Sequence, residues 1–299
     1  MYGTGTVWCQ SASEAAAWKA DPAGQAAKAA AEAAAEATAK RDRETAFQTA
    51  VAAAKAAAPA LAAAFRALEP GSDGESPFGA MKWIPAGTFS MGSPSSEAGR
   101  DDNETQHQVT LTKGYWMMEH EVTQGEWLAV MGTNPSHFTA CGPTCPVEMV
   151  SWDDAVAFAK AASKRDRVKY KLPTEAQWER AARGGRTGEV YAGGNELRAV
   201  GWTKENSDSK THGVCQKQRN GYGLCDMSGN VLEWTLDWYD KAYPGTTTDP
   251  VGAPSGSARV IRGGSWVNES ALARVANRSW SAPGNRGSNL GVRLVRSSP

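Results

Sequence analysis

The hydrophobic and polar positions divide the chain into two parts. Up to about Glu69, alanine dominates, and Lys, Glu, Gln and Arg stand between the alanines. Alanine has the strongest intrinsic preference for the α-helix and these charged residues follow closely. Residues 1–69 are therefore predicted to form an Ala-rich α-helical segment. Pro22 suits its first turn, whereas Pro59 should interrupt the helix, because proline removes a backbone donor and clashes with the preceding turn.

The second half of this segment carries larger apolar side chains at alternating steps of four and three residues. The seam consists of Phe47, Val51, Ala54, Ala58, Leu61, Phe65 and Leu68. Such a seam is typical of helix association, although alanine heptads bury little area. We expect a stalk for self-association or docking; the alternative is a helical extension that lies on its own globular domain.

From residue 78 onward, short apolar runs alternate with Gly, Pro, Asn and Asp. Residues 70–77, rich in Gly, Ser, Asp and Pro, are predicted to be a linker, and 78–299 a globular domain. Within the domain, short strands are predicted over 81–85 and 109–112. Helices are predicted over 124–131, 152–165 and 175–183, with Thr123, Ser151 and Thr174 as their N-caps. The fold class is α+β with abundant loops.

Charge and hydropathy exclude several classes of partner. The formal net charge is +0 with 21% charged residues, so no long-range field favours nucleic acid, although local basic patches remain compatible. No run reaches the length of about 20 apolar residues that a membrane span needs. The first residues have neither the basic start nor the apolar stretch of a signal peptide.

The five cysteines leave the redox state open. Cys141 with Cys145, and Cys215 with Cys225, could close two short disulfide loops. The alternatives are free thiols in a reducing compartment or, less favoured by the spacing, a zinc site. Cys9 is left over. Disulfides would indicate an extracellular or cell-surface location, and free thiols a cytoplasmic one.

Six runs occur together in one order along the domain. They are IPAGTFSMGS (84–93), EVTQGEW (121–127), PVEMVSW (146–152), LPTEAQWE (172–179), GYGLCDMSGNVLEW (221–234) and RGGSW (262–266). These runs resemble the formylglycine-generating-enzyme family, also called the sulfatase-modifying-factor family. The resemblance implies a loop-rich relative of the C-type lectin fold, built around a bound calcium.

The calcium site implied by this resemblance lies in the fifth run. Its ligands would be the side chains of Asp226 and Glu233 and the carbonyls of Gly229 and Val231. Closely spaced hard oxygen ligands on a bent backbone are what calcium selects. On spacing alone, Asp226 would be a helix cap and Glu233 a buried ion-pair partner.

The chemistry of the family is not matched. Formylglycine-generating enzymes of the aerobic type hold copper with two cysteines in the terminal segment, and copper(I) requires such soft ligands. The comparable run 266–272 contains no cysteine, and every cysteine of the chain precedes residue 226. The four histidines, His107, His120, His137 and His212, show no metal-ligand spacing. No copper and no catalytic residue are expected.

The terminal segment 262–293 also resembles the variable region of proteins diversified by retroelements. Scaffold positions would be Arg274, Arg278, Pro283, Arg286 and the run 290–293, with Val292 where that group usually has Phe. Between them stand the candidate ligand-binding residues Asn268, Ser270, Asn277, Ser279, Trp280, Ser281, Asn285, Ser288 and Asn289.

The function predicted from these observations is non-catalytic ligand binding. The chain would display a variable C-terminal face to a protein or other macromolecular ligand. A retroelement could diversify this face. The alternative is an enzyme or maturation factor of the same family that acts without the copper-binding cysteine pair.

Overall fold

The computed structural model describes residues 22–243 and 247–297. In chain order the elements are α2 (Pro22–Arg66), β1 (Gly74–Ser76), β2 (Gly79–Ile84), β3 (Gly87–Met91), β4 (His107–Leu111), β5 (Tyr115–Met118), α3 (Gln124–Met131), η1 (Thr139–Cys141), α4 (Trp152–Asp166), β6 (Tyr170–Lys171), α5 (Glu175–Ala182), α6 (Leu197–Val200), β7 (Leu232–Trp238), β8 (Arg259–Arg262), η2 (Ser270–Ala273), β9 (Ser279–Ser281), β10 (Leu290–Gly291) and β11 (Val295–Ser297). The chain divides between Gln48 and Thr49 into two compact units.

The helical prediction for the N-terminal segment holds over α2. Most side chains of residues 22–46, in the first unit, are exposed. Pro59 lies inside α2 without ending it, so the predicted interruption is wrong. Proline costs about 3 kcal/mol in a helix interior. The burial of Ala58 and Phe65 in the second unit offsets that cost.

The last turns of α2 belong to the globular unit. Phe65 joins its main core, edge-on to Trp116 with ring centroids 5.9 Å apart and stacked on Tyr170 at 6.4 Å. Val51 and Ala58 are buried as well. This half of the apolar seam therefore lies on its own domain, which is the second of the two alternatives for it.

The predicted linker 70–77 is also part of the globular unit. It contains β1, which pairs antiparallel with β2 in a short hairpin. Asp73 accepts a hydrogen bond from the backbone N–H of Trp83 at 2.9 Å. The structure thus places the boundary at Gln48 rather than at residue 70. Gly- and Ser-rich composition suits a hairpin turn as well as a linker, which explains the difference.

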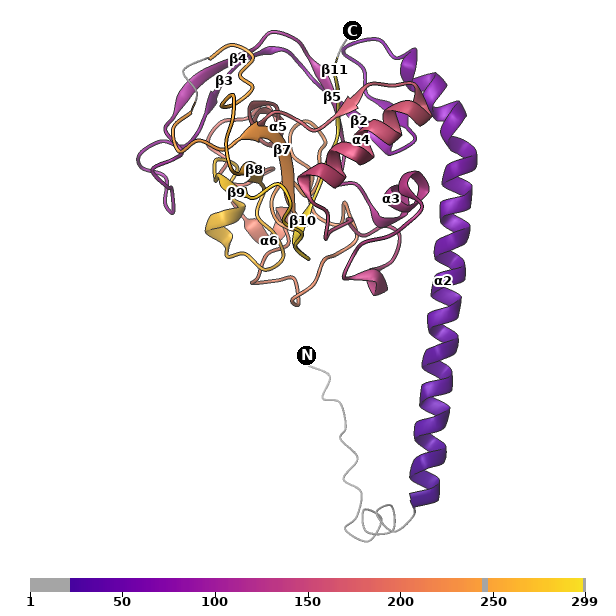
Figure 1. Cartoon of the computed structure of the whole chain (residues 1–299). Helices are drawn as coiled ribbons and strands as arrows, with labels where there is room; N and C mark the ends of the chain where they lie inside the picture. Colours follow the sequence, from indigo (N-terminus) through magenta and orange to yellow (C-terminus); the bar gives the residue numbers. More distant parts are fainter. Residues whose placement is uncertain (1–21, 244–246, 298–299) are drawn as a thin grey trace. The chain divides into compact units, whose positions relative to one another are not determined.

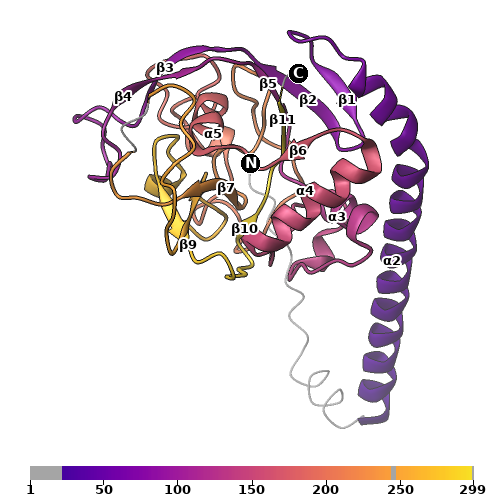
Figure 2. The same ribbon diagram turned by 45° about the horizontal axis from the view of Figure 1, so that its top comes forward.

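Among the described residues, eleven strands form three sheets. The largest has the order β1-β2-β5-β11-β6 with antiparallel neighbours, so the C-terminal strand lies inside it (Figures 1 and 2). The second, with the order β10-β7-β8-β9, carries much of the terminal segment; only its β10–β7 pair is parallel. β3 and β4 form a separate pair.

The helices begin where their caps predict. α3 has the predicted bounds, while α4 ends one residue later and α5 one residue earlier than predicted. Thr123, Ser151 and Thr174 each form a capping box. Trp127 and Phe158 stack with centroids 4.7 Å apart, which joins α3 to α4.

The five-stranded sheet separates two hydrophobic cores. Successive side chains of a strand point to opposite faces. Trp116 and Met118 of β5 accordingly enter one core, and Tyr115 and Met117 the other. A sheet buried on both faces gives the terminal segment a rigid base. Among the described helices, none combines the length and apolarity that a membrane span requires.

Candidate ligand-binding face

Buried ion pairs fix the terminal segment at regular points. Four of its arginines each pair with a glutamate from elsewhere in the chain, and all four side chains are at most 1% exposed. The pairs are Arg262–Glu179, Arg274–Glu104 (2.6 Å), Arg278–Glu175 (2.6 Å) and Arg293–Glu233 (2.8 Å). Breaking a buried pair costs more than breaking an exposed one, because the remaining charge stays desolvated.

The electrostatics of these pairs favour the charged forms. Burial alone would raise the pKa of Glu175, but the charges of Arg278 and Arg262 outweigh burial and hold that pKa below its usual value. Glu104 behaves in the same way: burial opposes ionisation, and hydrogen bonds from Arg274 and Ser93 lower its pKa overall. Both carboxylates therefore remain ionised partners at neutral pH.

The arginines also bind the backbone of neighbouring loops. Arg274 donates to the carbonyls of Gly99 at 2.6 Å and Ala271 at 3.0 Å. Arg278 donates to the carbonyl of Asn103 at 3.0 Å and lies 4.0 Å from the centroid of the Tyr243 ring. These contacts are what scaffold positions at Arg274 and Arg278 require, because charge-assisted hydrogen bonds hold the loops in place.

Trp280 is the exposed aromatic of the segment. It lies on β9, opposite Val260 of β8, and 54% of its surface is exposed. Its indole ring stacks on Tyr239 with centroids 4.4 Å apart. Ser279 and Ser281 flank it and are half-buried. Tyr239 directly follows the end of β7, and no sequence pattern indicated its place beside Trp280.

The remaining candidate residues, with one exception, reach the surface. Asn285 is exposed, and its Nδ2 donates to Ser281 Oγ at 2.9 Å. Asn268, Ser270, Ser288 and Asn289 are half-buried. Asn268 and Asn289 both hydrogen-bond the buried Ser265, at 2.6 and 3.2 Å, so the two ends of the segment meet there.

Asn277 is the exception, and its place on the predicted face was wrong. Only 3% of its surface is exposed. It lies within the run 273–278, which is buried throughout. Its carbonyl accepts a hydrogen bond from Arg262. The alternation of scaffold and display positions stops here because Arg274 and Arg278 draw the chain between them into the interior.

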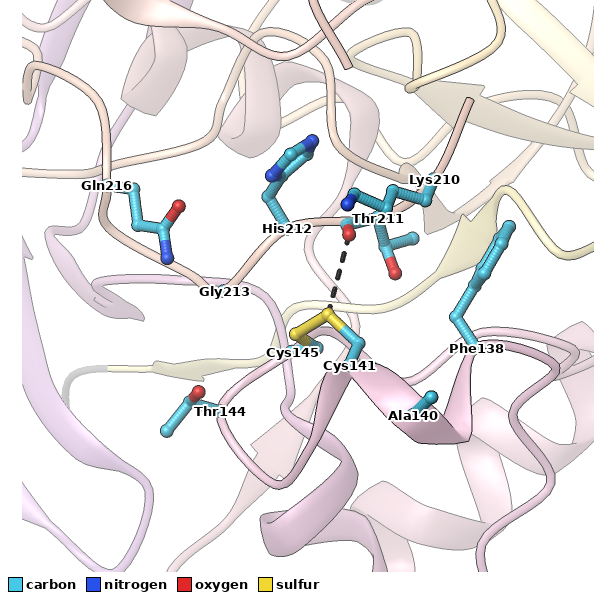
Figure 3. A pocket seen from close by; sticks show the side chains of 10 residues that line it. All are labelled: Phe138, Ala140, Cys141, Thr144, Cys145, Lys210, Thr211, His212, Gly213 and Gln216. Carbon is cyan, nitrogen blue, oxygen red and sulfur yellow. Dashed lines mark hydrogen bonds between the residues drawn. A yellow bond between two sulfur atoms is a disulfide. The ribbon is translucent and has the colours of Figure 1, made fainter. Parts of the chain in front are cut away.

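A pocket of about 430 Å³ lies next to the start of the segment. Figure 3 shows the Cys141–Cys145 disulfide on one side and Lys210, His212 and Gln216 on the other. Its lining residue Phe138 meets Trp266 edge-on at 5.2 Å. The spacing of its two cysteines indicated the disulfide loop on one side of this pocket, but no sequence pattern indicated the pocket itself.

Two disulfides are present. Cys141 bonds Cys145 with their Cα atoms 5.9 Å apart, and Cys215 bonds Cys225 at 5.1 Å. These are the pairings that the spacing suggested, and they leave no free thiol among the described residues. Cys9 lies outside the described residues.

The residues predicted to hold calcium divide into two situations. Asp226 is buried, and its Oδ1 has no hydrogen-bond partner within the described chain. A buried carboxylate oxygen of this kind fits a cation. Both oxygens of Glu233 instead accept hydrogen bonds from Arg293, and Oε2 also accepts one from Trp178. As it stands, Glu233 is the buried ion-pair partner that spacing alone allowed.

The surroundings of Asp226 are rich in negative charge. Glu121 accepts from the side chain of Asn230 at 3.0 Å and from the backbone of Val231 at 3.2 Å. Burial, and then the charge of Asp226, raises the pKa of Glu121 well above its usual value. Burial likewise raises the pKa of Asp226 itself. The described residues also bring Cys215 and Cys225 close to Asp226, but those sulfurs are disulfide-bonded and cannot act as thiolate ligands.

Comparison with known proteins identifies the domain. Residues 66–298 match the family described as "Sulfatase-modifying factor enzyme 1-like domain". The chain belongs to this family. It is 42% identical over 172 residues to the formylglycine-generating enzyme of Streptomyces coelicolor, covering 51% of this chain and 53% of that protein. It is 36% identical over 167 residues to the inactive C-alpha-formylglycine-generating enzyme 2 of Bos taurus, covering 50% of each. The chain thus spans about half the length of these two relatives.

A solved structure extends the comparison. Treponema denticola variable protein 1 is similar with a TM-score of 0.67 and 34% identity, over 73% of this chain and 95% of that chain. The predicted α+β, C-type-lectin-like fold of the formylglycine-generating-enzyme type is thereby confirmed.

Proposed function

We propose that this family member is a non-catalytic ligand-binding protein whose C-terminal segment is the binding face. The observation that carries the proposal is Trp280, more than half exposed on a short strand whose neighbours are held by buried ion pairs. Binding energy concentrates in large, rigid side chains of this type. Asn285 and the flanking serines add adaptable donors and acceptors, as in antibody loops.

The likeness to the Treponema variable protein supports a finer proposal, that the segment is diversified by a retroelement. Side chains between fixed arginines can change without disturbing the core, because they contribute little to it. Sequencing the DNA around the gene tests this proposal. A reverse transcriptase and a near-copy of the terminal coding segment are expected; an adjacent sulfatase gene without them would contradict it.

The second candidate function is an enzyme of the family, favoured by the identity with the Streptomyces formylglycine-generating enzyme. No cysteine follows Cys225, and the four described cysteines are paired in disulfides. Soft copper ligands are thus missing from the terminal segment. The name of the inactive bovine relative indicates that activity is not universal among similar proteins.

The two functions can be separated by two measurements. With a copper source, oxygen and a sulfatase-type cysteine peptide, mass spectrometry should detect no aldehyde product above a metal-free blank; turnover would favour the enzyme.

The binding measurement uses peptides selected from a random display library on the full chain. These peptides should bind at least tenfold more weakly to Trp280→Ala, since truncating a hot-spot residue costs about 2 kcal/mol or more. Val251→Ala is the matched control, because Val251 is 71% exposed and lies outside the segment. Equal losses in both variants would argue against the proposed face.

The proposal includes a structural calcium near Asp226. Its unpartnered Oδ1 and the carboxylate of Glu121 provide hard oxygen atoms, and a bound cation would relieve the repulsion between the two carboxylates. The carbonyls of Gly229 and Val231 would complete the set of calcium ligands, and Glu233 would have to share its oxygens with Arg293.

The partner bound at the terminal segment would be a protein or other macromolecule. The two disulfides favour an oxidising, extracellular or cell-surface location.

Self-association through the N-terminal helix is a further part of the proposal. The globular unit already covers Val51, Ala58 and Phe65, so association would involve the exposed Ala-rich turns before Gln48. Light scattering on the full chain and on a form that begins at Thr49 tests it. A higher mass for the full chain alone is expected; two monomers would contradict it.

A further inference from the structure

A strongly basic pocket lies in the globular unit, built from elements other than the strand that carries Trp280. Its volume is about 380 Å³. The lining residues come from the end of α2, the turn after α4, and strands β6 and β11. They are Arg66, Arg167, Val168, Lys169, Lys171, Arg296 and Ser297. Five of these seven residues are cationic and none is acidic.

The cations of this basic pocket are not paired in salt bridges within the described chain. None of its five cations forms a salt bridge with a described carboxylate, in contrast to the buried arginines of the terminal segment. The nearby carboxylate of Asp166 is taken by Arg165 at 2.5 Å. Arg66 donates to the backbone carbonyl of Asp166, and Arg296 donates to the backbone carbonyls of Phe65 and Arg66.

The base of the basic pocket is rigid. Arg296 is only 8% exposed, and its guanidinium lies 4.6 Å from the ring centroid of Phe65 and 4.4 Å from that of Trp116. Burial, followed by the charge of Lys169, lowers the pKa of Lys171, and burial lowers that of Arg296. Desolvated cations at a fixed position bind an anion without a large ordering cost.

Arg167 supplies an independent indication. It is the C-cap of α4 and adopts the left-handed conformation, with φ 53° and ψ 35°. Glycine is the favoured residue there, and a side chain costs roughly 1–2 kcal/mol. An arginine at this position is therefore less stable than a glycine would be, but it adds a charge to the rim of the basic pocket.

We propose that the basic pocket binds a multivalent anion of the phosphate class. Guanidinium groups match tetrahedral oxoanions in geometry and stay charged at all physiological pH values, and the lysines add point charges. The phosphate can belong to a free small molecule or to a lipid headgroup. The net charge of +0 does not oppose this proposal, because the field of the basic pocket is local.

The experiment uses the full chain in phosphate-free buffer at low ionic strength. Calorimetric titration with pyrophosphate tests the free ligand, and co-sedimentation with phosphatidylcholine vesicles, with and without phosphatidic acid, tests the headgroup. The variant Arg167→Gly with Lys169→Gln removes two rim charges, and glycine suits the left-handed backbone, so the fold should be retained. Lys164→Gln is the matched control, because Lys164 is exposed on α4 and does not line the basic pocket.

Binding in either arm that the double variant weakens at least tenfold, and that the control leaves unchanged, supports the proposal and identifies the source of the phosphate. The affinity for the anion should fall roughly tenfold for each cation removed, given the strength of charge-assisted hydrogen bonds. Absence of binding in both arms, or binding that both variants affect equally, overturns it. Thermal unfolding of the double variant at the wild-type temperature confirms that the comparison is made on folded protein.

Discussion

Within the terminal segment, the arginine positions and the positions between them differ in burial and in ion pairing. The side chains of Arg274 and Arg278 are 1% exposed and paired with glutamates, whereas Trp280, two residues after Arg278, is 54% exposed. The first group ties the segment to the core and the second contributes mainly surface. A binding face can therefore vary on a fixed backbone, provided that the arginines stay. The following predictions test that separation.

Removing a scaffold arginine should have the largest effect. Arg274→Met keeps the aliphatic volume but leaves Glu104 buried without its charge partner. Breaking a buried pair in this way costs about 3–5 kcal/mol, measured by denaturant unfolding. The control is Arg286→Met. Arg286 was a predicted scaffold position, but the structure places it at the surface, in an ion pair with Asp154 whose side chains are 52% and 33% exposed. Exposed pairs contribute about 1 kcal/mol or less. Similar losses in the two variants would remove the distinction between scaffold and surface.

Calcium should stabilise the scaffold beneath the face. A ligand that binds only the native state at one hundred times its Kd adds about 2.7 kcal/mol to the free energy of unfolding. A chelator should lower the melting temperature, and Asp226→Asn should abolish that response because it removes the charge of the carboxylate whose Oδ1 has no partner. An unchanged melting curve, together with elemental analysis that finds no calcium, would eliminate the site.

Behind the scaffold, Asp237 should make stability depend on pH. It accepts a hydrogen bond from the backbone of Glu175 at 2.8 Å, and burial, followed by the charge of Glu175, raises its pKa from 3.8 to about 7. The unfolded chain therefore loses this proton at lower pH than the folded chain does. The free energy of unfolding should therefore fall by about 2 kcal/mol between pH 5 and pH 8. Above the pKa of the folded chain it should level off.

Asp237→Asn should remove that dependence without removing the backbone hydrogen bond. The matched control is Asp102→Asn, because Asp102 is exposed and should leave the slope as it is. Denaturant unfolding at several pH values measures the slope directly. A wild-type chain that gains stability with rising pH in this window would contradict the assignment.

Local patterns predicted the helices well and the site only in part. Thr123, Ser151 and Thr174 fixed the starts of their helices because a capping box is formed by neighbouring residues alone. Asn277 is buried because Arg274 and Arg278, on either side of it, pair with Glu104 and Glu175, which reach them only through the fold. Sequence spacing shows no such contact.

Long-range packing likewise explains the differences at the N-terminus. The continuation of α2 through Pro59 depends on the burial of Phe65 in the core of the globular unit. The pairing of β1 with β2 explains why a stretch with the composition of a linker belongs to a sheet. The resemblance to the family predicted the fold, but it could not predict the basic pocket. Its residues come from three separate parts of the chain, and each part alone has the pattern of ordinary solvated charges.

The smallest change in stability is expected at the centre of the face itself. Trp280→Ala removes the stacking contact with Tyr239 but little buried area, because most of the indole is already in water. An aromatic pair contributes about 0.5–1.5 kcal/mol, so the free energy of unfolding should fall by about 1 kcal/mol. Trp234→Ala is the comparison within the same sheet: Trp234 is fully buried and donates to the carbonyl of Val150 at 2.9 Å. Its loss should cost about 3–5 kcal/mol. If Trp280→Ala destabilised the chain as much as Trp234→Ala, Trp280 would be a structural residue. The segment would then have no exposed anchor, and its serines and asparagines would be the surface of an ordinary loop.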